Sequence, residues 1–191
     1  MSSSLAIAAV TTTLRHILAQ AVAADPMPVA GAEVTTYQPV QLGSDGRSRA
    51  AGVNVYLYQV TPNTGWTTNA TTTVRADGSP GDRPSVALDL RYLISCYGDD
   101  KVLEPQRLLG SAVAALAGTP VLAPETVADA LAAYGTGATA YLSQSDLADQ
   151  PEPVRLAAAS LSVEDMAALW RTLGTSSLLS VTYTATAVLL H

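Results

Sequence analysis

Apolar residues recur along the first part of this chain with the spacing of a helix. Ile7 and Val10 are followed by Leu14, Leu18 and Ala21, at steps of three or four residues or close multiples of them. This spacing places the apolar side chains on one stripe of a helix. The sequence therefore predicts an amphipathic opening helix, with the serines that precede it as N-cap candidates.

A strict alternation of apolar and polar residues takes over later in the chain. It covers the segments 53–60, 85–97 and 179–189, and a period of two is typical of a strand with one buried face. We expect the 85–97 segment to be a long central strand. Two shorter segments, 33–40 and 154–158, are predicted as further strands.

Three more helices are predicted from their end signals. Proline suits the first turn of a helix because its missing N–H is not needed there, and it starts helices at Pro105 and Pro124. The last helix has a box-like start at Ser162 and Asp165, and Gly174 provides a left-handed stop. Each of these helices is bounded by local chemistry.

The order of these elements indicates an α+β fold. Helices do not alternate regularly with strands, so a doubly wound parallel sheet is disfavoured. We expect a mixed, largely antiparallel sheet flanked by helices, in a single domain that covers residues 1–191. Segment 61–84 between two strands is rich in Thr, Asn, Gly and Pro. Loops of that length are usually functional or disordered.

Composition narrows the classes of partner. Of the 191 residues, 48% are apolar, which is enough for one continuous core. The formal net charge is -6, and Lys101 is the single lysine among ten basic residues, so no basic stripe is expected to bind nucleic acid. The one cysteine, Cys96, excludes an intramolecular disulfide and fits a reducing compartment such as the cytoplasm.

The apolar N-terminal segment invites comparison with a signal peptide. No positive charge precedes it, and the threonines at 11–13 together with Arg15 and His16 interrupt it. The core of a signal peptide is uniformly apolar, so secretion by this route is disfavoured. No window reaches the about 20 apolar residues of a membrane span. We therefore expect a soluble protein without membrane insertion.

Cys96 and His16 are the candidates for a catalytic nucleophile and its base. Cys96 lies on the apolar face of its predicted strand, where a cysteine usually acts as a small inert hydrophobic residue. His16 lies between apolar positions of the first helix, and a catalytic base would need a positioned partner. We predict no catalytic residues.

Cofactor and metal motifs give weak signals. Residues 135–140, Gly-Thr-Gly-Ala-Thr-Ala, match a loose dinucleotide-binding pattern, but they follow a helix instead of joining a strand to one. Five acidic residues could gather a hard cation, although their spacing is not that of a calcium loop and solvated turns explain them better. These are Asp77, Asp82, Asp99, Asp100 and Glu104. We predict no cofactor and no metal site.

An aromatic cluster is the strongest candidate for an interface. Tyr56, Tyr58 and Trp66 lie within eleven residues, and rigid aromatic side chains often anchor protein contacts. Ordinary core packing of amphipathic rings is the alternative. Asp89 and Arg91 share a strand face and pair either with each other or across a subunit boundary. We predict these five residues as interface residues.

Four blocks of sequence carry a resemblance to a known family. In chain order they are Asn54-Val-Tyr-Leu-Tyr-Gln-Val-Thr-Pro-Asn63; Arg83-Pro84 with Leu88-Asp-Leu-Arg-Tyr-Leu93 and Tyr97-Gly98; Leu103-Glu-Pro-Gln-Arg-Leu-Leu-Gly-Ser111; and Ser160-Leu-Ser-Val-Glu164 with Leu169-Trp170. As a set they resemble the cap, or tail-terminator, proteins of extracellular phage-tail-like contractile injection systems of the antifeeding prophage and Photorhabdus virulence cassette type. No single block would suffice.

The resemblance implies a tail-terminator-like fold and a structural role. A cap of this family is expected to form a ring, a homohexamer, that ends the inner tube and the sheath at the end of the particle distal to the baseplate. The implied partners are copies of the chain itself and the tube and sheath proteins, without catalytic residues or cofactor. Assembly would take place in the cytoplasm, before the particle is released.

Three other functions stay open at this point. One is a tail-completion protein of an ordinary contractile phage, which would do the same kind of work on a DNA-carrying particle. The others belong to different classes: a small module that binds a ligand through its tyrosine-rich strand, or a small enzyme that uses Cys96 and His16.

Overall fold

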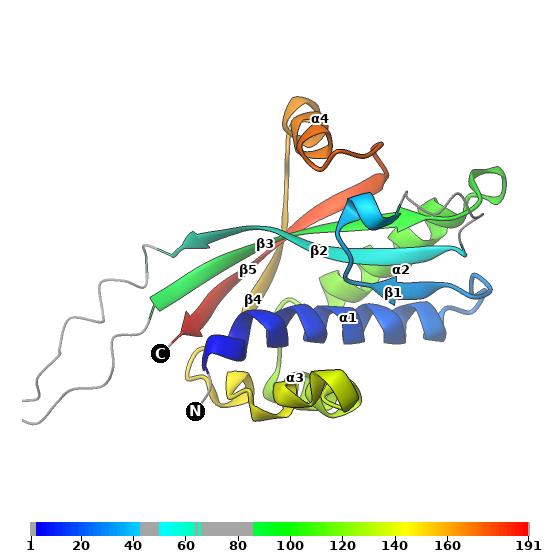
Figure 1. Ribbon diagram of the computed structural model, residues 1–191. Helices are drawn as coiled ribbons and strands as arrows, with labels where there is room; N and C mark the ends of the chain where they lie inside the picture. Colours follow the sequence, from blue (N-terminus) through cyan, green and yellow to red (C-terminus); the bar gives the residue numbers. More distant parts are fainter. Residues whose placement is uncertain (1–2, 43–49, 64, 66–85, 191) are drawn as a thin grey trace, which may run out of the picture.

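One mixed sheet organises the fold (Figure 1). The computed structural model describes residues 3–42, 50–63, 65 and 86–190. The first two strands in the sheet are parallel and every other neighbouring pair is antiparallel, which confirms the predicted mixed, largely antiparallel sheet. The spatial order is β1 (Glu33–Thr35), β2 (Gly52–Pro62), β3 (Val86–Tyr97), β5 (Leu179–Leu190) and β4 (Arg155–Ala159).

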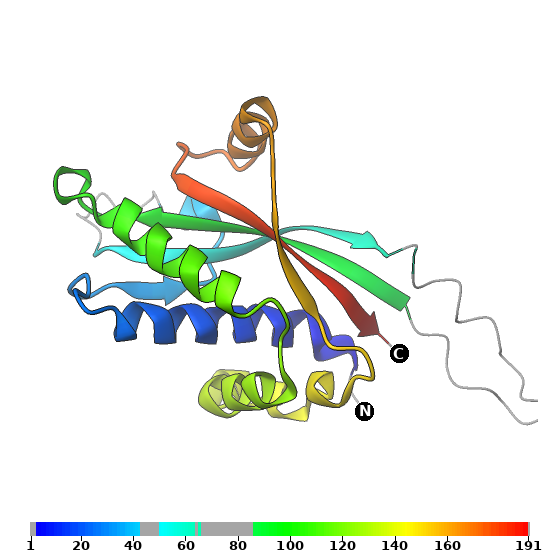
Figure 2. The same cartoon turned by 180° about the vertical axis from the view of Figure 1, so that it is seen from behind.

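Helices cover the two faces of the sheet unequally. On one face, α1 (Ala6–Ala24) and α2 (Glu104–Gly118) pack against the strands, and α3 (Pro124–Tyr134) packs on α1 as an outer layer (Figure 2). On the other side lies α4 (Val163–Thr172). Short 3-10 helices connect these elements: η1 (Ser3–Leu5), η2 (Pro39–Leu42), η4 (Asp100–Val102), η5 (Gly137–Gln144) and η6 (Leu147–Asp149).

The core forms where the stripe of α1 meets the central strands. Val10, Leu14 and Leu18 are fully buried, as the helical spacing predicted. Opposite them, Tyr92 of β3 is also fully buried, and its hydroxyl lies 2.9 Å from the Thr11 hydroxyl of α1. Burial raises the pKa of Tyr92 above its usual value, so the phenol stays neutral and acts as a hydrogen-bonding core residue.

Helix α1 corrects the expectation that no segment is long and apolar enough for a membrane span. Over Ala6–Ala24 its best window has a mean hydropathy of 1.2, which passes the usual criterion for one membrane-crossing helix. The threonines at 11–13 interrupt the run of apolar residues in the sequence, whereas a hydropathy averaged over the whole window still exceeds the threshold despite them. Because the same window is 44% buried and its stripe lies in the core, packing accounts for the apolar character of this helix.

Strand β1 is shorter than predicted. It ends at Thr35, although the sequence indicated a strand over 33–40. The reason is Asn54, a fully buried side chain on β2. Its carboxamide oxygen accepts from the Thr35 hydroxyl at 2.8 Å and from the Tyr37 N–H at 2.9 Å, and its amide donates to the Tyr37 carbonyl at 3.0 Å. These bonds replace the next ladder contacts and turn the chain away.

The predicted helix ends are confirmed. The Ser162 hydroxyl accepts from the Asp165 N–H at 3.0 Å, and Gly174 has a φ of 68°, the left-handed conformation that glycine adopts most easily. Pro105 and Pro124 both lie in first turns. Gly135 ends α3, so the glycine pattern at 135–140 follows a helix, as the sequence indicated.

Candidate functional site

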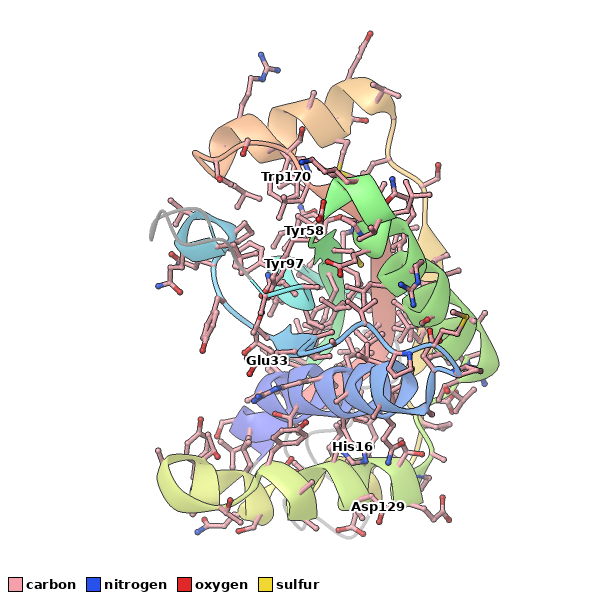
Figure 3. The ribbon with its side chains drawn as sticks, turned by 90° about the vertical axis from the view of Figure 1, so that its right-hand side faces the viewer. His16, Glu33, Tyr58, Tyr97, Asp129 and Trp170 are labelled. Atoms are coloured by element: carbon pink, nitrogen blue, oxygen red, sulfur yellow. The ribbon has the colours of Figure 1, made fainter. Side chains whose placement is uncertain are left out.

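The predicted aromatic residues lie on β2, the strand that extends furthest beyond its outer neighbour. Tyr56 and Tyr58 are half-buried, and Trp66 falls outside the described residues. A β-bulge between Leu57 and Gln59 shifts the register with β3 at Tyr58. The Tyr58 hydroxyl and the indole N–H of Trp170 are buried without a hydrogen-bond partner in the part of the chain that the structure describes, and both residues lie on the α4 side of the sheet (Figure 3).

Asp89 and Arg91 do not pair with each other. Both lie on β3, where the Asn63 amide donates to the Asp89 carboxylate at 2.8 Å. Arg91 is exposed. Across the described ranges the structure contains no ion pair between the two, so the intrachain alternative receives no support and the interface role of these five predicted residues stays a prediction.

The second half of β2 forms an open edge of the sheet. β1 pairs with β2 only through Asn54, while β2 continues to Pro62 (Figure 1). We call residues 57–62 the β2 tail. Val60 within it is 42% exposed, and Val86, the first residue of β3, at the same end of the sheet, is 51% exposed. This end of the sheet therefore presents apolar side chains to its surroundings.

A groove of about 380 Å³ lies at the start of the β2 tail, where Leu57 lines it, between β2, α1 and the region after α3. We call it the α1–β2 groove. Its walls combine small, aliphatic and aromatic side chains, and Arg15 is the one charged residue among the described residues that line it. The lining used below comprises Ala8, Thr12, Leu57, Tyr134, Tyr141 and Leu142.

Arg15 and Tyr134 fix the far end of this groove. The guanidinium carbon of Arg15 lies 4.5 Å from the centre of the Tyr134 ring, within cation–π range. His16 meets the same ring edge-on, with ring centres 6.0 Å apart, and its Nε2 lies 2.9 Å from the Gln20 side-chain nitrogen. His16 thus has packing partners between α1 and α3, as the structural interpretation predicted.

Cys96 is a core residue in this structure. Its side chain is 1% exposed, and burial raises the pKa of the Cys96 thiol to about 12. A thiol acts as a nucleophile through its thiolate, so this side chain is unreactive in the folded protein at neutral pH. The structure therefore gives the Cys96 and His16 enzyme alternative no support.

We predict that a thiol reagent labels Cys96 only as fast as the protein unfolds. Because burial raises the pKa of Cys96 from 9.0 to about 12, the folded state holds its proton more tightly than the unfolded state. The associated stability is present below pH 9.0 and is lost as the pH rises towards about 12. Labelling followed in urea, with pH-dependent unfolding of a Cys96→Ala control, measures both effects. Rapid labelling of the native protein would contradict this prediction.

Two of the three described acidic candidates, Asp99 and Glu104, bind backbone N–H groups around the start of η4. The Asp99 carboxylate accepts from the Lys101 N–H at 2.8 Å, and the Glu104 carboxylate accepts from the Asp99 N–H at 2.7 Å. They line a hollow of about 670 Å³ at the other end of the sheet. Asp77 and Asp82 lie outside the described residues. Among the residues placed by the structure, no three His, Cys, Asp or Glu side chains gather closely enough to hold a metal ion.

Sequence reasoning did not identify the α1–β2 groove. Tyr134 and Tyr141 follow alanine-rich and glycine-rich stretches without periodicity, so no local pattern indicates that they line a groove. In the sequence, Arg15 is only a polar break in an apolar segment. An arginine at a groove-facing helix position could have been flagged, but the position of α3 against α1 is a long-range feature that one sequence does not reveal.

Comparison with solved structures finds two proteins of contractile injection particles. One is the sheath/tube terminator of the extracellular contractile injection system PVC in its extended state, with 16% sequence identity, a TM-score of 0.49 and 85% of this chain covered. The other is the tube terminating cap of the anti-feeding prophage, with 15% identity, a TM-score of 0.45 and 72% covered. The match spans 50% and 42% of those two chains, so this chain corresponds to half of the first and to less than half of the second.

Sequence comparison gives the firmer assignment. No curated protein sequence matches the chain. The sequence model described as the Pvc16 N-terminal domain, however, matches residues 9–191. This range includes all the strands, every helix except η1 and the first turn of α1, and all four sequence blocks. The chain therefore belongs to the Pvc16 N-terminal domain family.

Proposed function

We propose that this chain is a structural cap subunit that ends the inner tube and the sheath of a contractile injection particle at the end distal to the baseplate. Family membership over residues 9–191 is the observation that carries the proposal. It gives this chain the role in which the two solved proteins are named, a sheath/tube terminator and a tube terminating cap.

The proposed assembly is a ring of identical copies, six-fold in symmetry. A head-to-tail contact between copies closes into a ring when its rotation permits, and otherwise produces an open filament. Tube and sheath are such open polymers, so a geometrically distinct ring is needed to stop addition at their growing end. The partners in this proposal are the chain itself and the tube and sheath proteins, with assembly in the cytoplasm before release.

A purely structural role fits the chemistry of the described residues. The Cys96 thiol is buried, and the acidic side chains at 99 and 104 bind backbone N–H groups. The proposal therefore assigns no catalytic residue, cofactor or metal. The decisive test of this role is made on particles.

We predict that deletion of this gene leaves particles with uncapped, irregular or prematurely contracted tails. Without a terminator, nothing distinguishes the last ring of the tube from a growing end. Electron microscopy of particles from the producing strain measures tail length and the state of the distal end, and images of wild-type particles show the symmetry of the cap.

Complementation separates this role from the enzyme alternative. A chain with Cys96→Ser and His16→Ala should restore uniform, sealed particles, because neither side chain takes part in the proposed contacts. Uniform sealed particles from the deletion strain would refute the cap function. A folded Cys96, His16 variant that fails to restore them would revive the enzyme alternative.

A further inference from the structure

Three stretches along the edges of the sheet are closed by specific contacts: the outer side of β1, the outer side of β4 and the end of β5. The first is the outer side of β1. The Glu33 N–H donates to the Ala51 carbonyl at 3.2 Å, so the backbone groups of Glu33 point towards β2 and those of its neighbour Val34 point away from the sheet. The outward Val34 carbonyl accepts from Nε of Arg15 at 3.1 Å. An α1 side chain thus takes the place that another strand could occupy.

The other two closed stretches lie on β4 and β5, at the opposite edge of the sheet from β1. Residues before α3 cover β4: the Leu156 N–H donates to the Pro120 carbonyl at 2.8 Å, and the Leu122 N–H donates to the Val154 carbonyl at 2.9 Å. The end of β5 is closed by one side chain. Gln150 donates to the Ala187 carbonyl at 2.7 Å and accepts from the Leu189 N–H at 3.2 Å.

The β2 tail has backbone groups that point away from the sheet. Before the bulge, the Ala51 carbonyl points towards β1, and the backbone groups of every second residue after it point to the same side, which brings those of Leu57, six places on, to the outer edge. After the bulge, the Asn63 N–H donates to the Ala87 carbonyl of β3 at 2.8 Å. Alternation from that residue turns Val60 and Pro62 outwards. Because β1 pairs only up to Asn54, no strand in the described ranges meets these groups.

An added strand along the β2 tail would also fill the α1–β2 groove. Alternate side chains of that strand would point to the helix-covered face, where Leu57, Ala8 and Leu142 line the groove. An apolar side chain of moderate size fits this lining, with Tyr141, 49% exposed, at its mouth. Arg15, the one charged described residue of the groove, would attract a carboxylate on the same strand.

We propose that the β2 tail receives an extended segment of a different protein of the same particle, which joins the sheet as an additional strand. The segment carries an apolar side chain for the groove and an acidic residue near Arg15. Open strand edges are templates for such pairing, and main-chain hydrogen bonds then provide affinity while the groove provides specificity. The identity of the donor as a tube or sheath subunit rests on the proposed cap function.

A second copy of this chain is disfavoured as the donor. Along β4 the contacts at Val154 and Leu156 leave Ala158 as the remaining outward residue, so the described chain offers no second open edge as long as the β2 tail. Pairing of two β2 tails would be a self-complementary, two-fold contact, whereas a ring of six needs a head-to-tail contact. No described segment of a second copy is therefore suited as the donor, which favours another protein of the particle.

Photo-crosslinking in purified particles tests the donor. A photoreactive amino acid replaces Val60, and a matched control replaces Val113, another exposed valine, which lies on α2. Crosslinked peptides identified by mass spectrometry are expected to join position 60 to an extended segment of a tube or sheath protein. A crosslink to a second copy of the chain, or none from capped particles, would overturn the inference.

Val60→Pro tests the strand pairing itself. Proline removes only the outward N–H at this position, because alternation from the Asn63 N–H bond gives the hydrogen bonds with β3 to Gln59 and Thr61. With the fold retained, the fraction of capped particles should fall about tenfold, the loss expected for one or two strand hydrogen bonds. Val60→Thr keeps the N–H and the β-branched shape, and should cap normally.

A second variant covers the case in which Val60→Pro does not fold. Thr12→Trp places an indole in the groove from α1 without changing any residue of β2, and should produce the same loss of capping in a folded chain. Folded Val60→Pro or Thr12→Trp chains that restore normal capping to the deletion strain would refute the strand proposal while leaving the cap function intact. Normal particles from the deletion strain itself would refute the cap function.

Discussion

Replacement of Asn54 by alanine is expected to lower the free energy of unfolding by about 3 kcal/mol, because three hydrogen bonds of a buried side chain are lost, each worth about 1 kcal/mol. Asn54 is fully buried and satisfies the Thr35 hydroxyl and both backbone groups of Tyr37. Alanine leaves all three without a partner, and the last residues of β1 lose the contacts that fix their exit from the sheet.

Urea unfolding of the isolated protein measures this effect. Asn63→Ala is the matched control, since Asn63 is only half-buried; its side chain donates to Asp89 at 2.8 Å and accepts from the Gly65 N–H at 3.0 Å. We expect the control to lose about 1 kcal/mol or less. Equal losses for the two variants would show that the Asn54 network contributes no more than an ordinary surface hydrogen bond, and would contradict the explanation given for the short β1.

The regular elements could be predicted because their signals are local. The stripe of α1 and the alternation of β3 and β5 are properties of neighbouring residues, and the structure places these elements within a few residues of the predicted limits. The helix signals at Ser162 and Gly174 work in the same way, since a cap is a contact within one turn.

The edges of the sheet could not be predicted, because they depend on residues far apart in sequence. Asn54 ends β1 across 17 to 19 positions, and Gln150 closes β5 across 37 to 39. The amides of Asn54 and Gln150 read in the sequence as ordinary polar residues. Strand order has the same origin, since β5 inserts between β3 and β4.

The candidate site was predicted only in part. The tyrosines on β2 predict an interface on the strand that carries the open edge. That prediction rests on the aromatic side chains and not on the edge itself. Tyr56 lines the groove, whereas Tyr58 lies at a bulge that the alternation did not indicate. The groove itself depends on Arg15 and Tyr134, which α1 and α3 bring together by tertiary packing.

Gly52→Ala is expected to destabilise the protein by about 2–3 kcal/mol, since overpacking of a tight site forces backbone shifts. Gly52 is the first residue of β2 and pairs with both β1 and β3. A Cβ atom there would lie 2.5 Å from the Tyr97 hydroxyl and 2.6 Å from the Glu33 carbonyl oxygen. Tyr97 could rotate, but the Glu33 carbonyl belongs to the backbone of β1 and must move with its strand.

The control for this prediction is Gly110→Ala, in the middle of α2, where an added Cβ would meet nothing within 4 Å. Alanine at an exposed helix position should stabilise the protein by up to about 1 kcal/mol, because glycine is the poorer helix former. The two glycine replacements should therefore shift thermal unfolding in opposite directions. If Gly52→Ala were as stable as the parent, β1 would have room to move away from β2 at little cost, and the close packing at the start of β2 could not be what holds β1 at the sheet edge.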